Sequence, residues 1–204
     1  MPCPAEAGVP PGPVGTGPGT SWGTAERQLP VAFVPGEPLT VMIAARPAAH
    51  ATAYAVEDAF PAGWTVADIS PEGELDAVHG KVKWGPFCDN TPRTLSYQLV
   101  PPAGASGVVA FTGAASFDGA SIPVAGTRQL RAGSRLRVAP EPVTGRLVLS
   151  LAGPTASRYL IETSTDLVRW LPLAEVTASP GGTILPLNSS PGEPQRFYRA
   201  QLIP

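Results

Sequence analysis

Proline and glycine interrupt this chain so often that a long helix cannot form over most of its length. There are 26 prolines and 22 glycines, 48 of the 204 residues. Proline fixes φ and donates no backbone hydrogen bond, so each one ends a strand ladder or breaks a helix. This fraction excludes a helical bundle and lies just below the level at which disorder becomes the default.

Between these interruptions, apolar and polar residues alternate in short runs. The clearest run is 93–100, and shorter ones occur at 39–43 and 81–84. Alternation with a period of two over four to eight residues is typical of a half-buried strand. The alanine-rich stretch 48–60 has helical propensity, but the alternation that begins at Tyr54 predicts a strand there. Turn signals recur about every 8–12 residues, which favours a β-sandwich.

Composition shifts along the chain predict four segments. Residues 1–26 are rich in proline and glycine and contain too few apolar residues to order themselves, so we expect a disordered linker. A β-sandwich is expected over 27–131. The Pro-Glu-Pro sequence that ends at Pro142 predicts a short stiff linker over 132–141. About five short strands are expected in a smaller β module over 142–204, which is marginal in size by itself.

A corner sequence and two strands give the larger segment a family resemblance. Pro61-Ala-Gly-Trp64 follows two acidic residues, Trp84-Gly85 closes a later strand, and a Leu-x-Tyr strand ends at Tyr97. This combination resembles the Ig-like domains of bacterial extracellular surface proteins over about residues 29–130. The resemblance implies an Ig-like antiparallel β-sandwich, so the expected fold class is all-β.

The end of the chain carries a second resemblance. Ser164-Thr-Asp-Leu-x-x-Trp170 and, further on, Arg196-Phe-Tyr-Arg199 are similar to a small β module at the C-termini of many large secreted bacterial proteins. The resemblance implies an extracellular or cell-surface multidomain protein whose upstream domains are partners of this region. It implies no activity, because fold likeness does not fix function.

The start of the chain bears on localisation. It has neither the basic region nor the apolar run of a signal peptide. We therefore expect the chain to be the C-terminal part of a longer secreted polypeptide.

Charge and hydropathy argue against nucleic acid and membrane insertion. The net charge is −2, and only 15% of the residues are charged, which gives no large field for a polyanion. No run reaches the roughly 20 apolar residues that span a bilayer. An arginine cluster surrounds the predicted linker but lacks the interleaved aromatic residues of a nucleic-acid surface. We interpret it as a solvated charge run, with an acidic glycan or a neighbouring domain as the alternative contact. Its members are Arg128, Arg131, Arg135, Arg137 and Arg146.

No catalytic motif or cofactor motif is present in the sequence. The two histidines, His50 and His79, lie in polar turn-like contexts, and neither accompanies a nucleophile elbow. The chain also lacks a phosphate-binding glycine loop and a His-Glu-x-x-His sequence. We expect a non-enzyme without cofactors, and the alternative is a catalytic activity that depends on either histidine.

The sequence offers candidate residues for three further kinds of site. Glu72, Glu74 and Asp76 offer oxygen ligands for Ca²⁺, but a solvated loop fits better because calcium requires six to eight ligands. A lysine–asparagine isopeptide bond would need a buried pair. Because Lys81 and Lys83 alternate with apolar residues they should face outward, and Asn90 lies in a turn. Cys3 and Cys88 form no disulfide framework, and whether they pair stays open.

The tryptophans provide the remaining candidates for ligand contact. Trp22 lies outside any strand pattern, whereas Trp64, Trp84 and Trp170 have the positions of core residues. The ligand candidates are therefore Trp22 and the corner residue Trp64. The predicted function is non-catalytic, a spacer, attachment or display region. The alternative is a carbohydrate-binding module that uses exposed aromatic residues or a loop rim.

Overall fold

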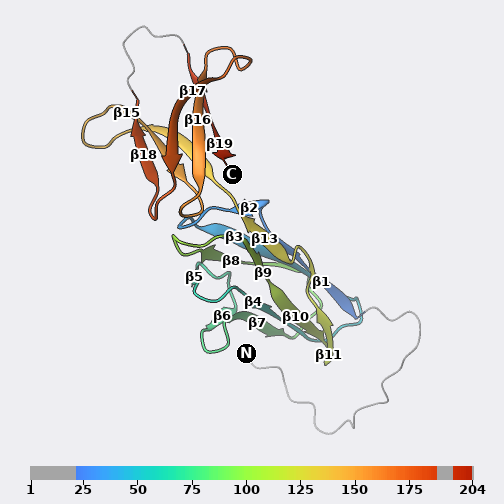
Figure 1. The fold of residues 1–204 in the computed structure, drawn as a ribbon. Coiled ribbons are helices and arrows are strands. Elements are labelled where there is room, and N and C mark those ends of the chain that lie inside the picture. The colour runs from blue at the N-terminus through green and yellow to red at the C-terminus, as the bar shows by residue number, and fades with distance from the viewer. Residues whose placement is uncertain (1–21, 188–194, 204) are drawn as a thin grey trace. The chain divides into compact units, whose positions relative to one another are not determined.

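The computed structural model describes residues 22–187 and 195–203, and every regular element in this part of the chain is a strand (Figure 1). The predicted all-β fold, with a β-sandwich and further small sheets, is confirmed. The described residues group into two compact units. The first contains 22–30, 40–99 and 109–129. The second contains 130–187 and 195–203 together with 31–39 and 100–108, two segments that the sequence had placed in the sandwich.

Two five-stranded sheets form the sandwich. The first has the order β12 (Ala125–Gly126), β1 (Gly23–Gln28), β3 (Leu39–Pro47), β8 (Arg93–Val100) and β5 (Thr65–Ala67). The second has the order β11 (Ala120–Pro123), β10 (Thr112–Phe117), β4 (Tyr54–Ala59), β7 (Lys81–Phe87) and β6 (Gly73–Asp76). Strand β5 ends one sheet and strand β6 ends the other, so both are edge strands.

The alternation in the sequence gives these strands their buried face. In β3 and β8 every second residue is buried, as the pattern predicts. Strand β4 begins at Tyr54, after a turn, so the alanine-rich stretch does not form a helix. Asp118 and Gly119 form the two-residue loop between β10 and β11. Both of its residues have positive φ, as a tight β-hairpin with the right-handed twist requires.

A buried ion pair joins the two sheets inside the sandwich. Arg27 of β1 and Asp58 of β4 are fully buried, and Arg27 Nε donates to the two carboxylate oxygens of Asp58 at 3.0 and 3.2 Å. The Tyr97 hydroxyl donates to the same carboxylate at 2.8 Å, and Arg27 also donates to the Thr127 carbonyl at 3.2 Å. Burial raises the pKa of Asp58, and the hydrogen bonds from Arg27 and Tyr97 oppose that effect.

The remaining strands form three three-stranded sheets. One consists of β2 (Ala32–Phe33), β13 (Gln129–Ala132) and β9 (Val108–Ala110). Another consists of β14 (Arg135–Pro140), β15 (Leu147–Ala152) and β18 (Thr183–Pro186). The third consists of β17 (Leu171–Thr177), β16 (Arg158–Ser164) and β19 (Phe197–Ile203).

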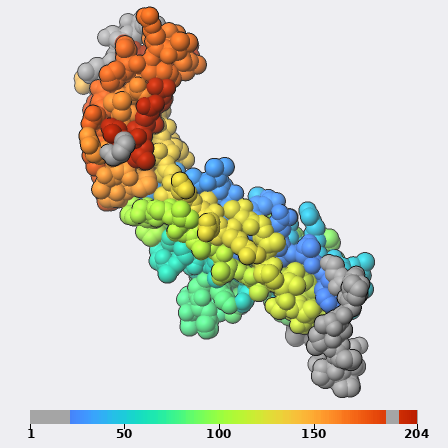
Figure 2. Space-filling view, turned by 45° about the vertical axis from the view of Figure 1, so that its right-hand side comes forward, coloured from blue at the N-terminus to red at the C-terminus, as the bar shows by residue number. Residues whose placement is uncertain are grey.

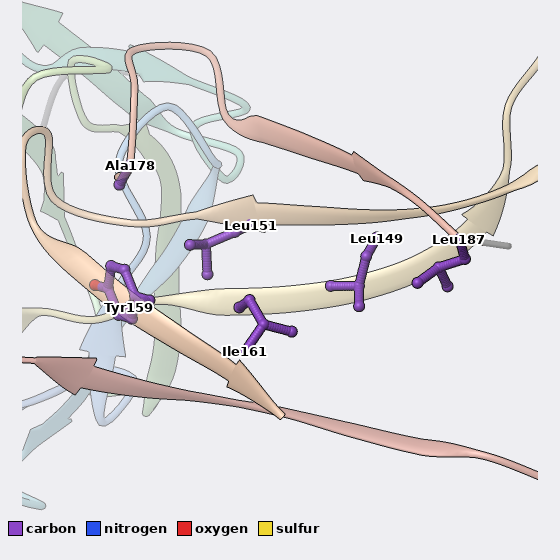
Figure 3. Close-up of a cluster of buried hydrophobic side chains, with 6 residues drawn as sticks. All are labelled: Leu149, Leu151, Tyr159, Ile161, Ala178 and Leu187. Atoms are coloured by element: carbon purple, nitrogen blue, oxygen red, sulfur yellow. The ribbon is translucent and has the colours of Figure 1, made fainter. Parts of the chain in front are cut away.

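The last two of these sheets enclose a core of their own. Figure 3 shows its side chains gathered between β15, β16 and the segments around β18. The buried members are Leu149, Leu151, Tyr159, Ile161, Ala178 and Leu187.

Strand pairing changes two of the predicted segment boundaries. Strand β14 lies within the expected linker 132–141 and pairs with β15 from Arg135 to Pro140. Strand β1 begins at Gly23, inside the expected linker 1–26, because it pairs with β3 from its first residue. Residues 1–21 of that linker lie outside the described residues.

Candidate binding site

An apolar pocket of about 620 Å³ opens at one side of the sandwich. Its walls come from the end of β4, the corner before β5, the edge strand β6 and the turn between β6 and β7. This turn lies at the molecular surface, in the teal to green segment of the space-filling view (Figure 2). The side chains that define the pocket are Phe60, Trp64, Val66, Leu75, Val78 and His79.

Strand register explains why apolar side chains face this opening. Leu75 of β6 lies opposite Val82 of β7, which is completely buried. Residues directly opposite in an antiparallel pair point to the same face, so Leu75 points toward the inside of the sandwich. It nevertheless remains 41% exposed, because no further strand covers β6. The pocket is therefore an incompletely filled side of the core.

Trp64 forms part of the wall of the pocket. At this corner the Trp64 amide donates a hydrogen bond to the Pro61 carbonyl, and Gly63 adopts the left-handed conformation that glycine tolerates. The Trp64 ring packs edge-to-face on Phe111, with centroids 6.4 Å apart, and is only 8% exposed. The predicted ligand candidate is thus mainly a core residue, and little of its ring is available for stacking.

A charged cluster next to the pocket contains Asp76, His79 and Lys83. Asp76 accepts hydrogen bonds from Lys83 Nζ at 2.5 Å and from the backbone amide of His79 at 3.1 Å, and His79 Nδ1 lies 2.8 Å from its carboxylate. The hydrogen bonds from Lys83 and His79 hold the pKa of Asp76 well below its usual range. The same contact with Asp76 raises the pKa of Lys83. Asp76 is therefore ionised at neutral pH.

The lowered carboxyl pKa values give the sandwich a pH dependence at acidic pH. The pKa of Asp89 is also lowered, first by Arg93 and then by the amide of Thr91. When the folded-state pKa is below the unfolded value, the stabilisation is present above the unfolded pKa, near 3.9, and is lost as the pH falls toward the folded value. We expect the melting temperature to fall as the pH decreases from about 5 to about 2, with a shallower fall in Asp89→Asn. If the melting temperature of Asp89→Asn fell just as steeply, Asp89 would not contribute to the pH dependence.

The calcium candidates are not brought together as a ligand set. Asp76 is occupied by Lys83 and His79, Glu72 lies 3.7 Å from Arg93, and Glu74 lies opposite Lys83 in the sheet. Across residues 22–187 and 195–203, no three His, Cys, Asp or Glu side chains are placed to hold a metal ion.

The other aromatic candidate lies at the opposite end of β4. Trp22 packs edge-on against His50, with ring centroids 5.5 Å apart, in the region that precedes Tyr54. His79 lies at the far end of the same strand, where the Phe60 amide donates to the Gly80 carbonyl. The two histidines therefore do not share a site, and Trp22 and Trp64 do not form one aromatic surface.

The side chains considered for covalent bonds have other partners. Lys81 pairs with Glu57 at 2.6 Å, and the Asn90 side chain donates to the Ala49 carbonyl at 2.6 Å. The structure thus does not join a lysine to Asn90. Cys88 is disulfide-bonded, and Cys3 lies outside the described residues. In the arginine cluster, Arg135 forms an ion pair with Glu37 at 2.5 Å.

The tail motif folds into a self-contained turn. Ser164 Oγ accepts from the Leu167 amide at 2.9 Å, and Asp166 accepts from the amides of Val168 and Arg169. Serine and aspartate side chains commonly accept from backbone amides two or three residues further on, which closes such a turn. Trp170 was predicted to be a core residue, and this prediction is wrong.

Trp170 packs instead against a cation at the surface of the second unit. The Arg199 guanidinium lies 4.3 Å from the ring centroid, and Arg199 pairs with Glu162 at 2.7 Å. The ring is half-buried beside this guanidinium and is not a member of the buried hydrophobic cluster of the second unit.

Fold and pocket together define an all-β protein whose sandwich has one open, apolar side. No family model matches the chain, and no curated protein is significantly similar to it. Within the part of the chain that the structure describes, no helix is long and apolar enough to cross a membrane.

Proposed function

We propose that this chain is a non-catalytic region of a secreted or cell-surface protein that spaces, attaches or displays neighbouring domains. The observation that carries the proposal is the cross-sheet network of Arg27, Asp58 and Tyr97. A buried ion pair tolerates little displacement, because losing either partner leaves an uncompensated charge in the core. Such a network favours a rigid module, and rigidity is what a spacer requires.

Force spectroscopy on the full chain tests the spacer role. With handles at both termini, we expect separate cooperative unfolding events, because the sandwich and the C-terminal sheets have separate cores. The Asp58→Asn variant should lower the unfolding force of the sandwich event alone. Gradual extension without cooperative events would contradict the proposal.

Carbohydrate binding is the second candidate, and the pocket at Trp64 is the observation that favours it. Its volume falls within the roughly 300–1,000 Å³ typical of ligand pockets, and Thr65 and His79 add polar side chains to its lining. The test is a pull-down of the full chain with insoluble polysaccharides. Saturable binding that His79→Ala abolishes and Trp22→Ala preserves would support a carbohydrate-binding module. Absence of binding to every polysaccharide would count against it.

A further inference from the structure

The open side of the sandwich combines a free strand edge with an apolar pocket. Strand β6 ends its sheet, and its only neighbour among the described strands is β7. No described strand pairs with its other edge, where the Gly73 amide donates to the Ser70 carbonyl, and an edge strand of this kind can pair with an additional strand beyond that turn. Directly beside this edge lie the inward-facing side chain of Leu75 and the pocket that it lines.

The exposed side chains at this place are unusually apolar for a strand edge. Leu75 is 41% exposed although it points inward, and Val78 in the adjoining turn is 89% exposed. The pocket wall contributes Phe60, Trp64 and Val66, and only Thr65 and His79 add polar side chains. A sugar ring would find few hydrogen-bond partners in this interior, whereas apolar side chains would fill it.

The charges around β6 distinguish between possible occupants. Glu74 is exposed on the outer face of β6, opposite Lys83, whose ammonium group is bonded to Asp76. Asp76 also binds His79, so Glu74 is the carboxylate of β6 that keeps its capacity for a new cation. A strand beside β6 would place its outward-facing side chains next to Glu74, where a basic residue is favourable.

We infer that an extended peptide from a partner protein adds to β6 as a further strand of its sheet. Alternate side chains of the peptide are apolar and fill the pocket at Trp64 and Leu75, and an intervening basic side chain pairs with Glu74. Main-chain hydrogen bonds supply affinity in this mode, and the pocket supplies specificity. The inference rests on the attachment role proposed above and names the chemistry of the partner.

Selection from a library of random decapeptides displayed on phage, with the full chain immobilised, tests this inference. We expect enriched sequences in which apolar residues alternate and basic residues intervene. Each enriched peptide is then synthesised, labelled and titrated against the full chain by fluorescence anisotropy. N-methylation of its backbone on the edge that faces β6 should abolish binding, because this change removes main-chain donors without altering the protein.

Two matched variants locate the site. Leu75→Lys should weaken binding at least about tenfold, the loss expected at a central contact. Leu173→Lys changes a leucine of nearly equal exposure, 42%, on β17 of the second unit, and should leave the affinity within about twofold. Glu74→Lys should weaken the binding of peptides that carry basic residues and reduce the salt dependence of that binding. Thermal melts confirm that each variant is folded.

Three results would overturn the inference. They are the absence of enriched peptides, binding that survives both Leu75→Lys and backbone N-methylation, and polysaccharide binding that Leu75→Lys abolishes. The last result would assign the pocket to a glycan. If the full chain unfolds cooperatively under force but selects no peptide, the strand-addition inference fails while the spacer proposal stands.

Discussion

Replacing Asp58 with alanine is expected to lower the free energy of unfolding of the sandwich by about 3–5 kcal/mol, because Arg27 would remain buried without a counter-charge. The Tyr97 hydroxyl would also lose its acceptor. Urea denaturation of the full chain, followed by tryptophan fluorescence, measures the loss. The neighbouring residue Glu57 provides a matched control, since it faces the opposite side of β4 and pairs with Lys81 in a partly exposed position.

Glu57→Ala should cost no more than about 1 kcal/mol, the usual contribution of a surface pair. Replacing Arg27 and Asp58 together with apolar residues of similar volume should recover much of the loss, because no isolated charge remains. If Asp58→Ala lowered the free energy of unfolding as little as Glu57→Ala, the buried pair would not be important for the stability of the sandwich.

Trp84→Ala is expected to cost about 3–5 kcal/mol, as large-to-small changes of buried aromatic residues do. The Trp84 side chain is almost completely buried, its ring centroid lies 6.0 Å from that of Tyr97, and its Nε1 donates to Ser70 Oγ at 3.0 Å. The alanine would leave a cavity, and Ser70 Oγ would keep only one of its two donors, the Ser96 amide. Thermal and urea unfolding of the full chain measure the effect.

Trp170→Ala is the comparison of the same residue type. Trp170 is half-buried beneath Arg199, so its loss should cost about 1 kcal/mol, the scale of an exposed cation–π contact. Equal costs for the two tryptophans would contradict the difference in their burial that the structure shows.

Strand positions could be read from the sequence because burial of one sheet face imposes a period of two on the residues themselves. The runs at 39–43, 81–84 and 93–100 all lie in strands. The turn at Asp118-Gly119 also follows from local sequence, because both positions have positive φ and aspartate followed by glycine favours that conformation.

The sequence was insufficient where the deciding contact came from another segment of the chain. Arg27 occupies a buried position in β1 and is compatible with that position only because Asp58, 31 residues later, supplies the counter-charge. The Pro-Glu-Pro sequence led to the prediction of a linker where β14 lies, whereas these residues form a strand because they pair with β15. Trp170 was expected in a core, but its ring packs against the Arg199 guanidinium.

The candidate site, too, was predicted only in part from the sequence. Its residues Trp64, Asp76 and His79 were each singled out in the sequence, but for stacking, calcium and acid–base roles that the structure does not assemble. The sequence alone determined an all-β chain, its turns and most of its strands, because these depend on neighbouring residues. Only the tertiary structure decided which strands became edges, which charges were paired inside, and where the core stayed open, because these depend on how strands far apart in sequence pair and pack.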